Sequence, residues 1–270
     1  MKLAFSSLAA PDQPLAEFLK QVAAAGYDGV ELRGKDRKHL DPAMSAAERA
    51  EVRRLLADTC LEAAAVTSYV VLAPDSADRA KAEATLAAYI DLARDVGSPL
   101  LRVFGGRIPQ GEDRGAVERR MADVLLAVAG RAAAASVDLC VETHDEFTRA
   151  EDLARVLMLA RHPNVCALWD VNNQFESGEP VARGMELLYD ELGYLHIKDS
   201  FPLGGDKRQL CFLGAGDVPI AQVVQMLKAR DFGGYLVVEW EKAWHPDLPP
   251  ADVAMVQHIL KLREYAGAGV

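Results

Sequence analysis

Residues 138–171 read DLCVETHDEFTRAEDLARVLMLARHPNVCALWDV, and this stretch contains the structural unit that recurs along the chain. It opens with an apolar run, Asp138–Thr143, continues through a charged segment of helical periodicity, Arg149–Ala160, and closes on a second apolar run, Ala167–Val171. Runs that are apolar throughout, without alternating polar residues, are typical of parallel strands covered by helices. The stretch therefore predicts a strand–helix–strand unit.

The same alternation recurs along all 270 residues. We predict eight strands, at Leu3–Ser6, Gly29–Leu32, Ala63–Thr67, Leu100–Phe104, Asp138–Thr143, Ala167–Val171, Tyr194–Lys198 and Tyr235–Glu239. The predicted helices are Ala16–Ala25, Ala46–Thr59, Ala77–Asp95, Arg114–Ala135, Arg149–Ala160, Val181–Glu191, Ile220–Ala229 and Pro250–Tyr265. A repeat of about 34 residues is what a strand and its crossover helix require.

The predicted fold class is α/β, a single (β/α)8 TIM-barrel domain over residues 1–270. The competing architecture is an open, doubly wound sheet, which usually has a glycine-rich turn after its first strand. The residues at that position are Ser6-Ser7-Leu8-Ala9, which contain no glycine. The sequence therefore favours the barrel.

Composition and charge exclude several classes of protein. Apolar residues make up 50% of the chain and charged residues 26%, which is a globular composition and excludes a disordered or collagen-like chain. Forty acidic against thirty basic residues give a net charge of −10, which disfavours binding to nucleic acid. No apolar run approaches the roughly 20 residues of a membrane span, and residues 1–12 lack a secretory leader pattern. We expect a cytoplasmic protein that does not bind membranes.

Four consecutive predicted strands end in side chains that can bind a metal ion, namely Glu142, Asp170, His196 and Glu239. The carboxyl ends of the strands of a parallel barrel meet on one face, so these groups are expected to lie together. Three carboxylates and one imidazole suit a divalent ion such as Mn²⁺, Mg²⁺, Co²⁺ or Zn²⁺. Without a cation their mutual repulsion would be costly. We predict a site for one divalent metal ion.

Several motifs together resemble the sugar phosphate isomerase/epimerase family, the xylose-isomerase-like TIM barrels. The motifs are Gly26-Tyr27-Asp28-Gly29-Val30-Glu31-Leu32, Arg102-Val103-Phe104-Gly105-Gly106, Val141-Glu142-Thr143-His144, Trp169-Asp170, His196-Ile197-Lys198-Asp199, Gly214-Ala215-Gly216-Asp217-Val218 and Val238-Glu239. The resemblance covers essentially the whole chain, but it does not single out a substrate.

The resemblance implies a metal, manganese among the candidates, held by the four strand-end residues, with Glu142 and Glu239 also acting as the acid/base pair. One glutamate would remove a proton next to a carbonyl, and the other would return a proton to the resulting cis-enediolate. The implied substrate is a small sugar, keto-polyol or hydroxy-keto acid, and the outcome is isomerisation or epimerisation. Relatives of this kind often form homo-oligomers.

Three further residues are candidates for contact with substrate. Many relatives have a histidine three residues after the sixth-strand aspartate, where this chain has Asn173, which puts the ordinary epimerase substrates in doubt. His144 follows Glu142 by two residues and is either a general base or a histidine that orients a carboxylate. Lys198 either stabilises substrate oxygens or forms a salt bridge with Asp199 or Glu239.

Other side chains have weaker signals. Among the arginines, Arg208 is the candidate for a substrate carboxylate or phosphate, whereas Arg102 is expected to carry surface charge. Trp240 is expected to shield the substrate from water. Glu31 and Arg33 are expected to form an internal ion pair.

Three alternative functions remain. The first is a lyase or dehydratase that cleaves a C–O or C–C bond at the same metal, with His144 or Lys198 as base. The second is an abasic-site DNA endonuclease, which needs three zinc ions and therefore more histidines than this chain's six, and a surface less acidic than net −10. The third is a non-catalytic subunit, which would have no reason to retain four buried ligands.

Overall fold

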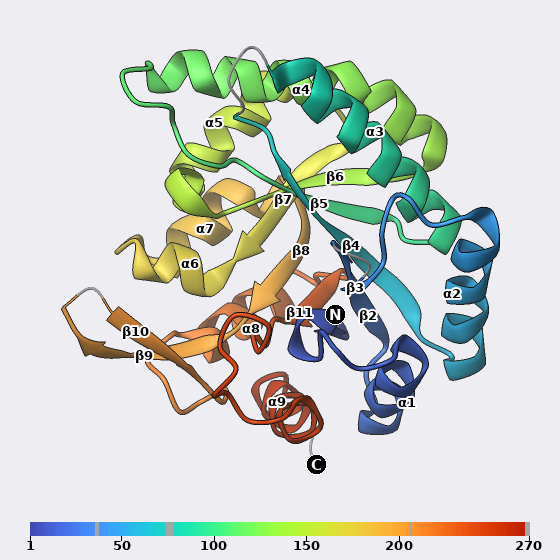
Figure 1. Ribbon diagram of the computed structural model, residues 1–270. Helices are drawn as coiled ribbons and strands as arrows, with labels where there is room; N and C mark the ends of the chain where they lie inside the picture. Colours follow the sequence, from blue (N-terminus) through green and yellow to red (C-terminus); the bar gives the residue numbers. More distant parts are fainter. Residues whose placement is uncertain (36–37, 74–77, 206, 268–270) are drawn as a thin grey trace.

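Eight parallel strands form a closed barrel in the computed structural model, which describes residues 1–35, 38–73, 78–205 and 207–267 (Figure 1). They are β1 (Lys2–Ser6), β2 (Gly29–Lys35), β4 (Glu62–Val71), β5 (Leu100–Phe104), β6 (Asp138–Glu142), β7 (Val165–Asp170), β8 (Leu192–Ile197) and β11 (Tyr235–Val238). Each strand pairs with the next in chain order, and β1 pairs with both β2 and β11, so the sheet has no free edge there. The predicted TIM barrel is confirmed.

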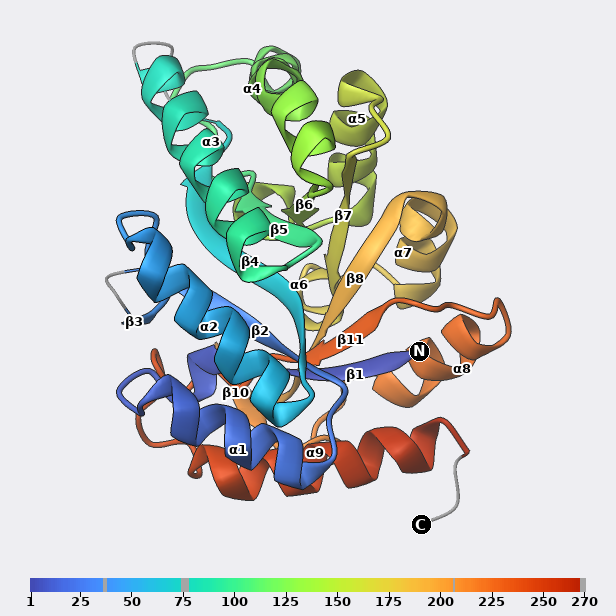
Figure 2. The same cartoon turned by 90° about the vertical axis from the view of Figure 1, so that its right-hand side faces the viewer.

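Helices surround the barrel, as the view in Figure 2 shows. They are α1 (Leu15–Ala25), α2 (Ala46–Thr59), α3 (Arg79–Val96), α4 (Arg114–Ala135), α5 (Ala150–Ala160), α7 (Val181–Leu188), α8 (Ile220–Lys228) and α9 (Ala251–Tyr265). Local interactions define some of the helix ends. The Ser45 hydroxyl caps the start of α2 by accepting a hydrogen bond from the Glu48 amide, and Gly97 ends α3 in the left-handed conformation, with φ +85°. Ala77, where we expected the third helix to begin, lies outside the described residues.

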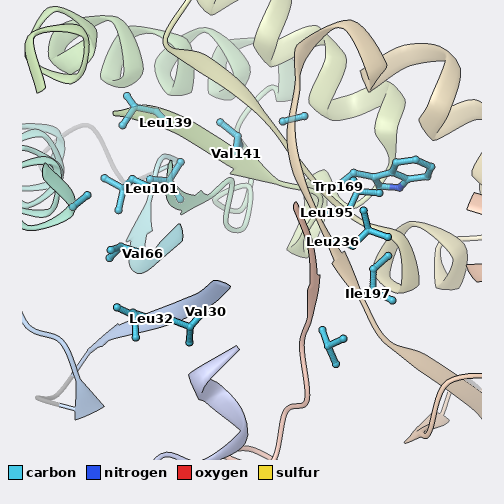
Figure 3. Close-up of a cluster of buried hydrophobic side chains, with 14 of the residues drawn as sticks. Val30, Leu32, Val66, Leu101, Leu139, Val141, Trp169, Leu195, Ile197 and Leu236 are labelled. Atoms are coloured by element: carbon cyan, nitrogen blue, oxygen red, sulfur yellow. The ribbon is translucent and has the colours of Figure 1, made fainter. Parts of the chain in front are cut away.

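The strands bury both of their faces. Val141, Trp169 and Ile197 belong to the layer between strands and helices, which Figure 3 shows. A second, smaller cluster fills the barrel itself and includes Cys140 and Leu168. Because successive side chains on a strand point to opposite faces, Glu142 and Asp170 share the inward face with Cys140 and Leu168. This alternation directs the polar strand ends into the barrel.

Some elements were not predicted. A two-residue strand, β3 (Lys38–His39), pairs antiparallel with β2. A short helix, α6 (Val171–Glu176), follows β7 directly, and an antiparallel hairpin of β9 (Asp199–Gly204) and β10 (Lys207–Cys211) projects from the barrel after β8. The helix predicted to continue to Glu191 ends at Leu188 and is followed by the 3-10 turn η4 (Tyr189–Glu191).

Asp199 ties the hairpin to the loop that follows it. Its carboxylate accepts hydrogen bonds from the backbone amides of Gly214, Gly216 and Val218 at 2.9, 3.1 and 3.2 Å. A Cβ atom at Gly216 would lie 2.1 Å from the Asp199 Oδ1 atom, so only glycine fits there. Asp199 therefore anchors this loop and does not pair with Lys198.

None of the helices in the described part of the chain is long and apolar enough to cross a membrane.

Candidate metal centre

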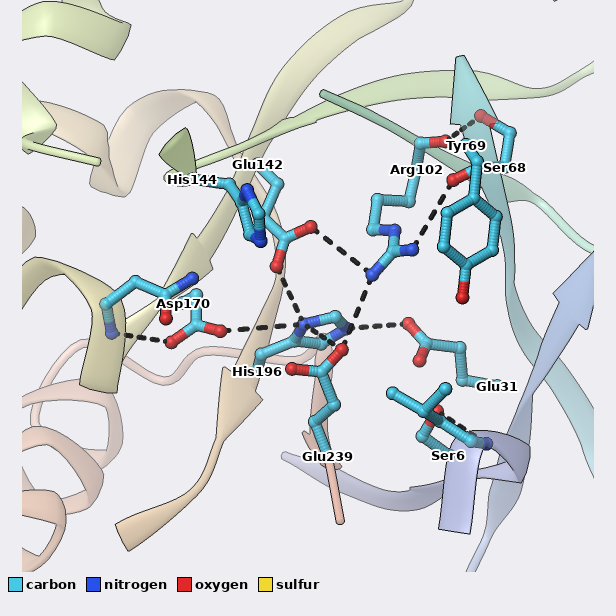
Figure 4. A network of polar contacts seen from close by, with 12 residues as sticks. Ser6, Glu31, Ser68, Tyr69, Arg102, Glu142, His144, Asp170, His196 and Glu239 are labelled. Carbon is cyan, nitrogen blue, oxygen red and sulfur yellow. Dashed lines mark hydrogen bonds and ion pairs between the residues drawn. The ribbon is translucent and has the colours of Figure 1, made fainter. Parts of the chain in front are cut away.

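Glu142, Asp170, His196 and Glu239 meet at the carboxyl ends of β6, β7, β8 and β11, which are neighbours in the barrel (Figure 4). One ligand atom from each lies within 4.8 Å of the others, and all four side chains are buried. The Nδ1 atom of His196 lies 3.2 Å from Glu142 Oε1, 3.3 Å from Glu239 Oε1 and 3.9 Å from Asp170 Oδ2. The geometry thus brings together the four residues that the sequence singled out.

The junction between β7 and α6 orients Asp170. Its Oδ1 atom accepts from the Asn173 amide at 2.9 Å and so caps α6, while its own amide donates to the Thr143 hydroxyl at 2.8 Å. The other oxygen, Oδ2, is left to face the cluster. The sharp turn from strand to helix at Asp170 therefore sets both the start of α6 and the direction of this carboxylate.

Two buried cations offset the negative charge of the cluster. Arg102 Nη1 lies 3.3 Å from Glu142 Oε2 and 3.4 Å from Glu239 Oε1. Lys198 Nζ lies 2.8 Å from Asp170 Oδ2 and 2.7 Å from Glu239 Oε2, and it also contacts Glu241. Of the alternatives considered for Lys198, the salt bridge with Glu239 is present. The prediction that Arg102 carries surface charge is wrong, since its side chain is only 5% exposed.

The carboxylates respond differently to this environment. Burial, together with the charges of Glu239 and Glu142, raises the pKa of Asp170 to about 6. Burial also acts on Glu239, but the positive charges of His196 and Lys198 outweigh it and hold the pKa of Glu239 well below its usual range. The pKa values of Asp170 and Glu239 are thus shifted in opposite directions, and shifted pKa values are typical of functional sites.

The donor set fits a divalent metal ion. Three carboxylates and one imidazole nitrogen are ligands that Mg²⁺, Mn²⁺, Co²⁺ and Zn²⁺ accept. Glu142 Oε2 and Asp170 Oδ2 are buried and have ion pairs, but neither accepts a hydrogen bond of good geometry from the described residues. Such oxygens have free lone pairs for a cation. The cluster is the one group of this kind found among the described residues.

A pocket of about 760 Å³ opens beside the cluster. Its wall includes Lys198, Asn173 from α6, Arg208 from β10, and Glu241 and Trp244 from the loop after β11. Lys198 lines this pocket and also contacts Asp170 and Glu239, so the pocket lies directly beside the cluster. The volume suits a small organic molecule.

Comparison with known proteins agrees with this arrangement. The model of the family described as xylose isomerase-like TIM barrel matches residues 19–264. The chain belongs to this family. No curated protein matches the sequence.

Solved structures show how widely the xylose isomerase-like fold is shared. A crystal structure of the IolI protein with a binding zinc atom is 16% identical, covers 99% of this chain and 98% of its own, and has a TM-score of 0.85. A D-psicose 3-epimerase from Clostridium cellulolyticum H10, solved with D-tagatose, is 16% identical, covers 98% and 99%, and has a TM-score of 0.80. The probable 3-DHS dehydratase AsbF from Bacillus anthracis is 18% identical, covers 94% and 97%, and has a TM-score of 0.77. At these identities the likeness shows the fold alone.

His144 does not continue the strand in this xylose isomerase-like barrel. β6 ends at Glu142, and His144 begins the 3-10 turn η3 (Asp145–Phe147). Its ring packs on Phe104, with 4.6 Å between centroids, and its Nδ1 atom lies 3.0 Å from Asp145 Oδ2. The side chain is 39% exposed, and Phe104, on which it packs, also lies against Arg102.

Asn173, Arg208 and Trp240, which are predicted from the sequence to lie near the substrate, all line the pocket. Asn173 donates through Nδ2 to the Thr143 carbonyl at 3.2 Å. Arg208 forms ion pairs with Glu176 and Asp217. Trp240 is only 1% exposed because its ring stacks on Phe212, so little of it can reach a ligand.

Glu31 has a role that the sequence reasoning missed. The predicted ion pair with Arg33 is wrong: Glu31 Oε2 lies 2.7 Å from His196 Nε2, and Arg33 donates to the Tyr69 hydroxyl at 2.8 Å. A signal was present, because Glu31 lies between Val30 and Leu32, which face the helices, and a charged residue at such a position must point into the barrel.

Proposed function

We propose that this protein is a divalent-metal-dependent isomerase or epimerase that acts on a small sugar, keto-polyol or hydroxy-keto acid. The observation that carries the proposal is the convergence of Glu142 and Glu239. They lie at the ends of β6 and β11, which are separated in the barrel by β7 and β8. Their Oε1 atoms nevertheless lie 3.2 and 3.3 Å from the same His196 nitrogen, Nδ1. Two carboxylates thus face one small space.

Glu142, Asp170, His196 and Glu239 would hold the metal ion. A divalent cation there would polarise a substrate carbonyl and make the adjacent C–H bond more acidic. Metal dependence is also in keeping with the zinc named for the IolI structure.

The two glutamates would move the proton. One of them would accept it from the carbon next to the carbonyl, and the other would deliver a proton from the other side. Delivery to the neighbouring carbon gives isomerisation, and delivery to the opposite face of the same carbon gives epimerisation. Arg102, which lies 3.3 Å from Glu142 and 3.4 Å from Glu239, would hold both carboxylates in place through this exchange.

Lys198 would bind the substrate. Its side chain lines the pocket, and its ammonium group also contacts Asp170 in the cluster. The ammonium group can therefore donate a hydrogen bond to the substrate oxygen on which negative charge develops. A second buried cation, Arg102, lies at the same cluster. Because Arg102 is already paired with Glu142 and Glu239, Lys198 is the cation that a substrate carboxylate would contact, and the hydroxy-keto acids belong in the proposal for this reason.

The test is hydrogen exchange in D₂O. Protein loaded with Mn²⁺, Co²⁺, Zn²⁺ or Mg²⁺ is incubated with a panel of keto-sugars and hydroxy-keto acids, and NMR follows deuterium entering the carbon next to the carbonyl. We expect exchange and a new isomer or epimer for at least one compound. Glu239→Gln should lower the rate by about 10²–10⁴-fold, because it removes a proton-transfer group and a ligand charge. Full activity in a folded Gln variant would contradict the assignment.

A lyase or dehydratase is the second candidate, and the position of His144 favours it. His144 follows Glu142 by two residues and is 39% exposed, and its Nδ1 atom lies 3.0 Å from Asp145 Oδ2, so the ring would be available as a general base. The structural likeness to a probable dehydratase is in keeping with this reading. Product analysis separates the two candidates: a lyase yields a smaller or unsaturated product, whereas an isomerase conserves mass.

A further inference from the structure

Glu31 contacts a proposed metal ligand from across the barrel. It lies on β2, which is separated from β8, the strand of His196, by β1 and β11. Its Oε2 atom is 2.7 Å from His196 Nε2, and neither side chain is exposed (Figure 4). The proton transfer described above makes no use of this contact, so the burial of this carboxylate needs its own explanation.

The contact keeps hydrogen on the Nε2 atom of His196. A carboxylate oxygen only accepts hydrogen bonds, so the Nε2 atom of His196 must be the donor. In a neutral imidazole the other nitrogen, Nδ1, then has the free lone pair. Nδ1 is the atom that faces Glu142, Glu239 and Asp170. In the structure it can donate to Glu142 Oε1 at 3.2 Å, and a bound metal ion would take the place of that proton. Glu31 thus directs the basic nitrogen toward the cluster.

Tyr194 holds Glu31 in this position. Its hydroxyl donates to Glu31 Oε2 at 3.0 Å, and it lies two residues before His196 on the same inward face of β8. The two rings also meet edge to face, with 5.5 Å between centroids and 76° between planes. The carboxylate and the imidazole are therefore both fixed by packing inside the barrel.

We propose that Glu31 is a positioning residue that locks His196 as the Nε2–H tautomer and presents Nδ1 to the metal ion. This inference rests on the proposed function, since it requires a metal at the cluster. A negatively charged acceptor also makes the imidazole a stronger donor, and loss of such a partner typically weakens metal binding by about 10–100-fold.

The test measures metal affinity directly, without activity. Mn²⁺ or Zn²⁺ is titrated against a chelating dye in the wild-type protein and in Glu31→Gln, Glu31→Met and Tyr194→Phe. Gln keeps an acceptor but loses the charge, and Met loses both, so we expect affinity to fall in the order wild type, Gln, Met. Glu62→Gln is the matched control, because Glu62 begins β4 at the opposite end of the barrel and pairs with Lys2.

A second readout does not depend on any variant. ¹⁵N-histidine NMR of the wild-type protein loaded with Zn²⁺ reports which nitrogen of His196 is protonated. We expect hydrogen on Nε2 and zinc on Nδ1. The opposite assignment would overturn the proposal even if no Glu31 variant folds.

The outcomes separate this inference from the proposed function. If the wild type binds one metal ion and Glu31→Met binds it equally well, the role of Glu31 is refuted while the metal site stands. If the wild type binds no metal, both proposals fail. A loss in Glu31→Met that Glu62→Gln shares would indicate general destabilisation and would also refute the specific role.

Discussion

Lys198 Nζ lies 2.8 Å from Asp170 Oδ2, one of the side chains that would hold the metal ion. The ammonium group also lies 2.7 Å from Glu239 Oε2 and is almost fully buried. It therefore supplies positive charge between two proposed ligands, and a divalent cation would compete with it for both. This relationship ties the stability of the protein to the occupancy of the metal site.

Lys198→Met should separate these effects. Without metal, the variant should be less stable by about 3–5 kcal/mol, because removing one partner leaves buried carboxylates uncompensated. With metal bound, the loss should shrink, and the metal should bind about tenfold or more tightly because its competitor is gone. Thermal unfolding and metal titration measure the two quantities. Weaker metal binding in the variant would contradict this account.

Metal content provides a direct test of the site. We expect about one equivalent of Mn, Co, Zn or Mg per chain, by elemental analysis, in protein purified without added metal or chelator. A chelator should lower the unfolding temperature, because a ligand that binds only the folded state stabilises it. About three equivalents of zinc would point to a different, multinuclear chemistry, and none after metal is offered back would refute the site.

Asn173→His should change substrate preference more than metal affinity. Asn173 lies in the pocket wall, and its side chain donates to the Thr143 carbonyl, whereas its bond to Asp170 Oδ1 comes from the backbone amide, which histidine would keep. Relative rates across a panel of keto-sugars should therefore shift, while the metal dissociation constant stays within about threefold. An unchanged rate profile would count against a substrate role for this position.

His258 should make stability depend on pH. It is buried against Trp240 and Phe212 and donates through Nδ1 to the Ala254 carbonyl. Burial lowers the pKa of His258 from 6.5 to about 4, so the unfolded chain binds a proton more readily than the folded one between these values. Neutral, buried His258 therefore contributes fully to stability above pH 6.5. As the pH falls from 6.5 toward 4, the free energy of unfolding should decrease by about 3 kcal/mol.

Comparison with His258→Gln isolates this contribution, because glutamine does not titrate. The wild type should lose stability more steeply than the variant between pH 6.5 and 4 in urea unfolding. Parallel curves would show that His258 is not the residue responsible.

Much of the candidate site could be predicted from the chain alone. Apolar runs at a spacing of about 34 residues predict parallel strands and crossover helices, and the closure of such a sheet brings all the strand ends to one face. Glu142, Asp170, His196 and Glu239 are therefore neighbours by topology, and their inward direction follows from strand periodicity. Backbone geometry decides both which of these residues are neighbours and in which direction their side chains point, and the local sequence pattern encodes that geometry.

The partners of those side chains depend on residues far apart in the sequence. Glu31 pairs with His196 across 165 positions, and Arg102 approaches Glu239 across 137. Closure of the barrel brings these pairs together, and no local sequence pattern indicates which residues will meet. The turn after Glu142 that moves His144 off the strand is likewise visible only once the chain has folded. The barrel and its four strand-end groups can thus be predicted from the chain alone. Which charges lie against those groups depends on the tertiary structure, because a buried charged group is stable only where the fold places a partner beside it.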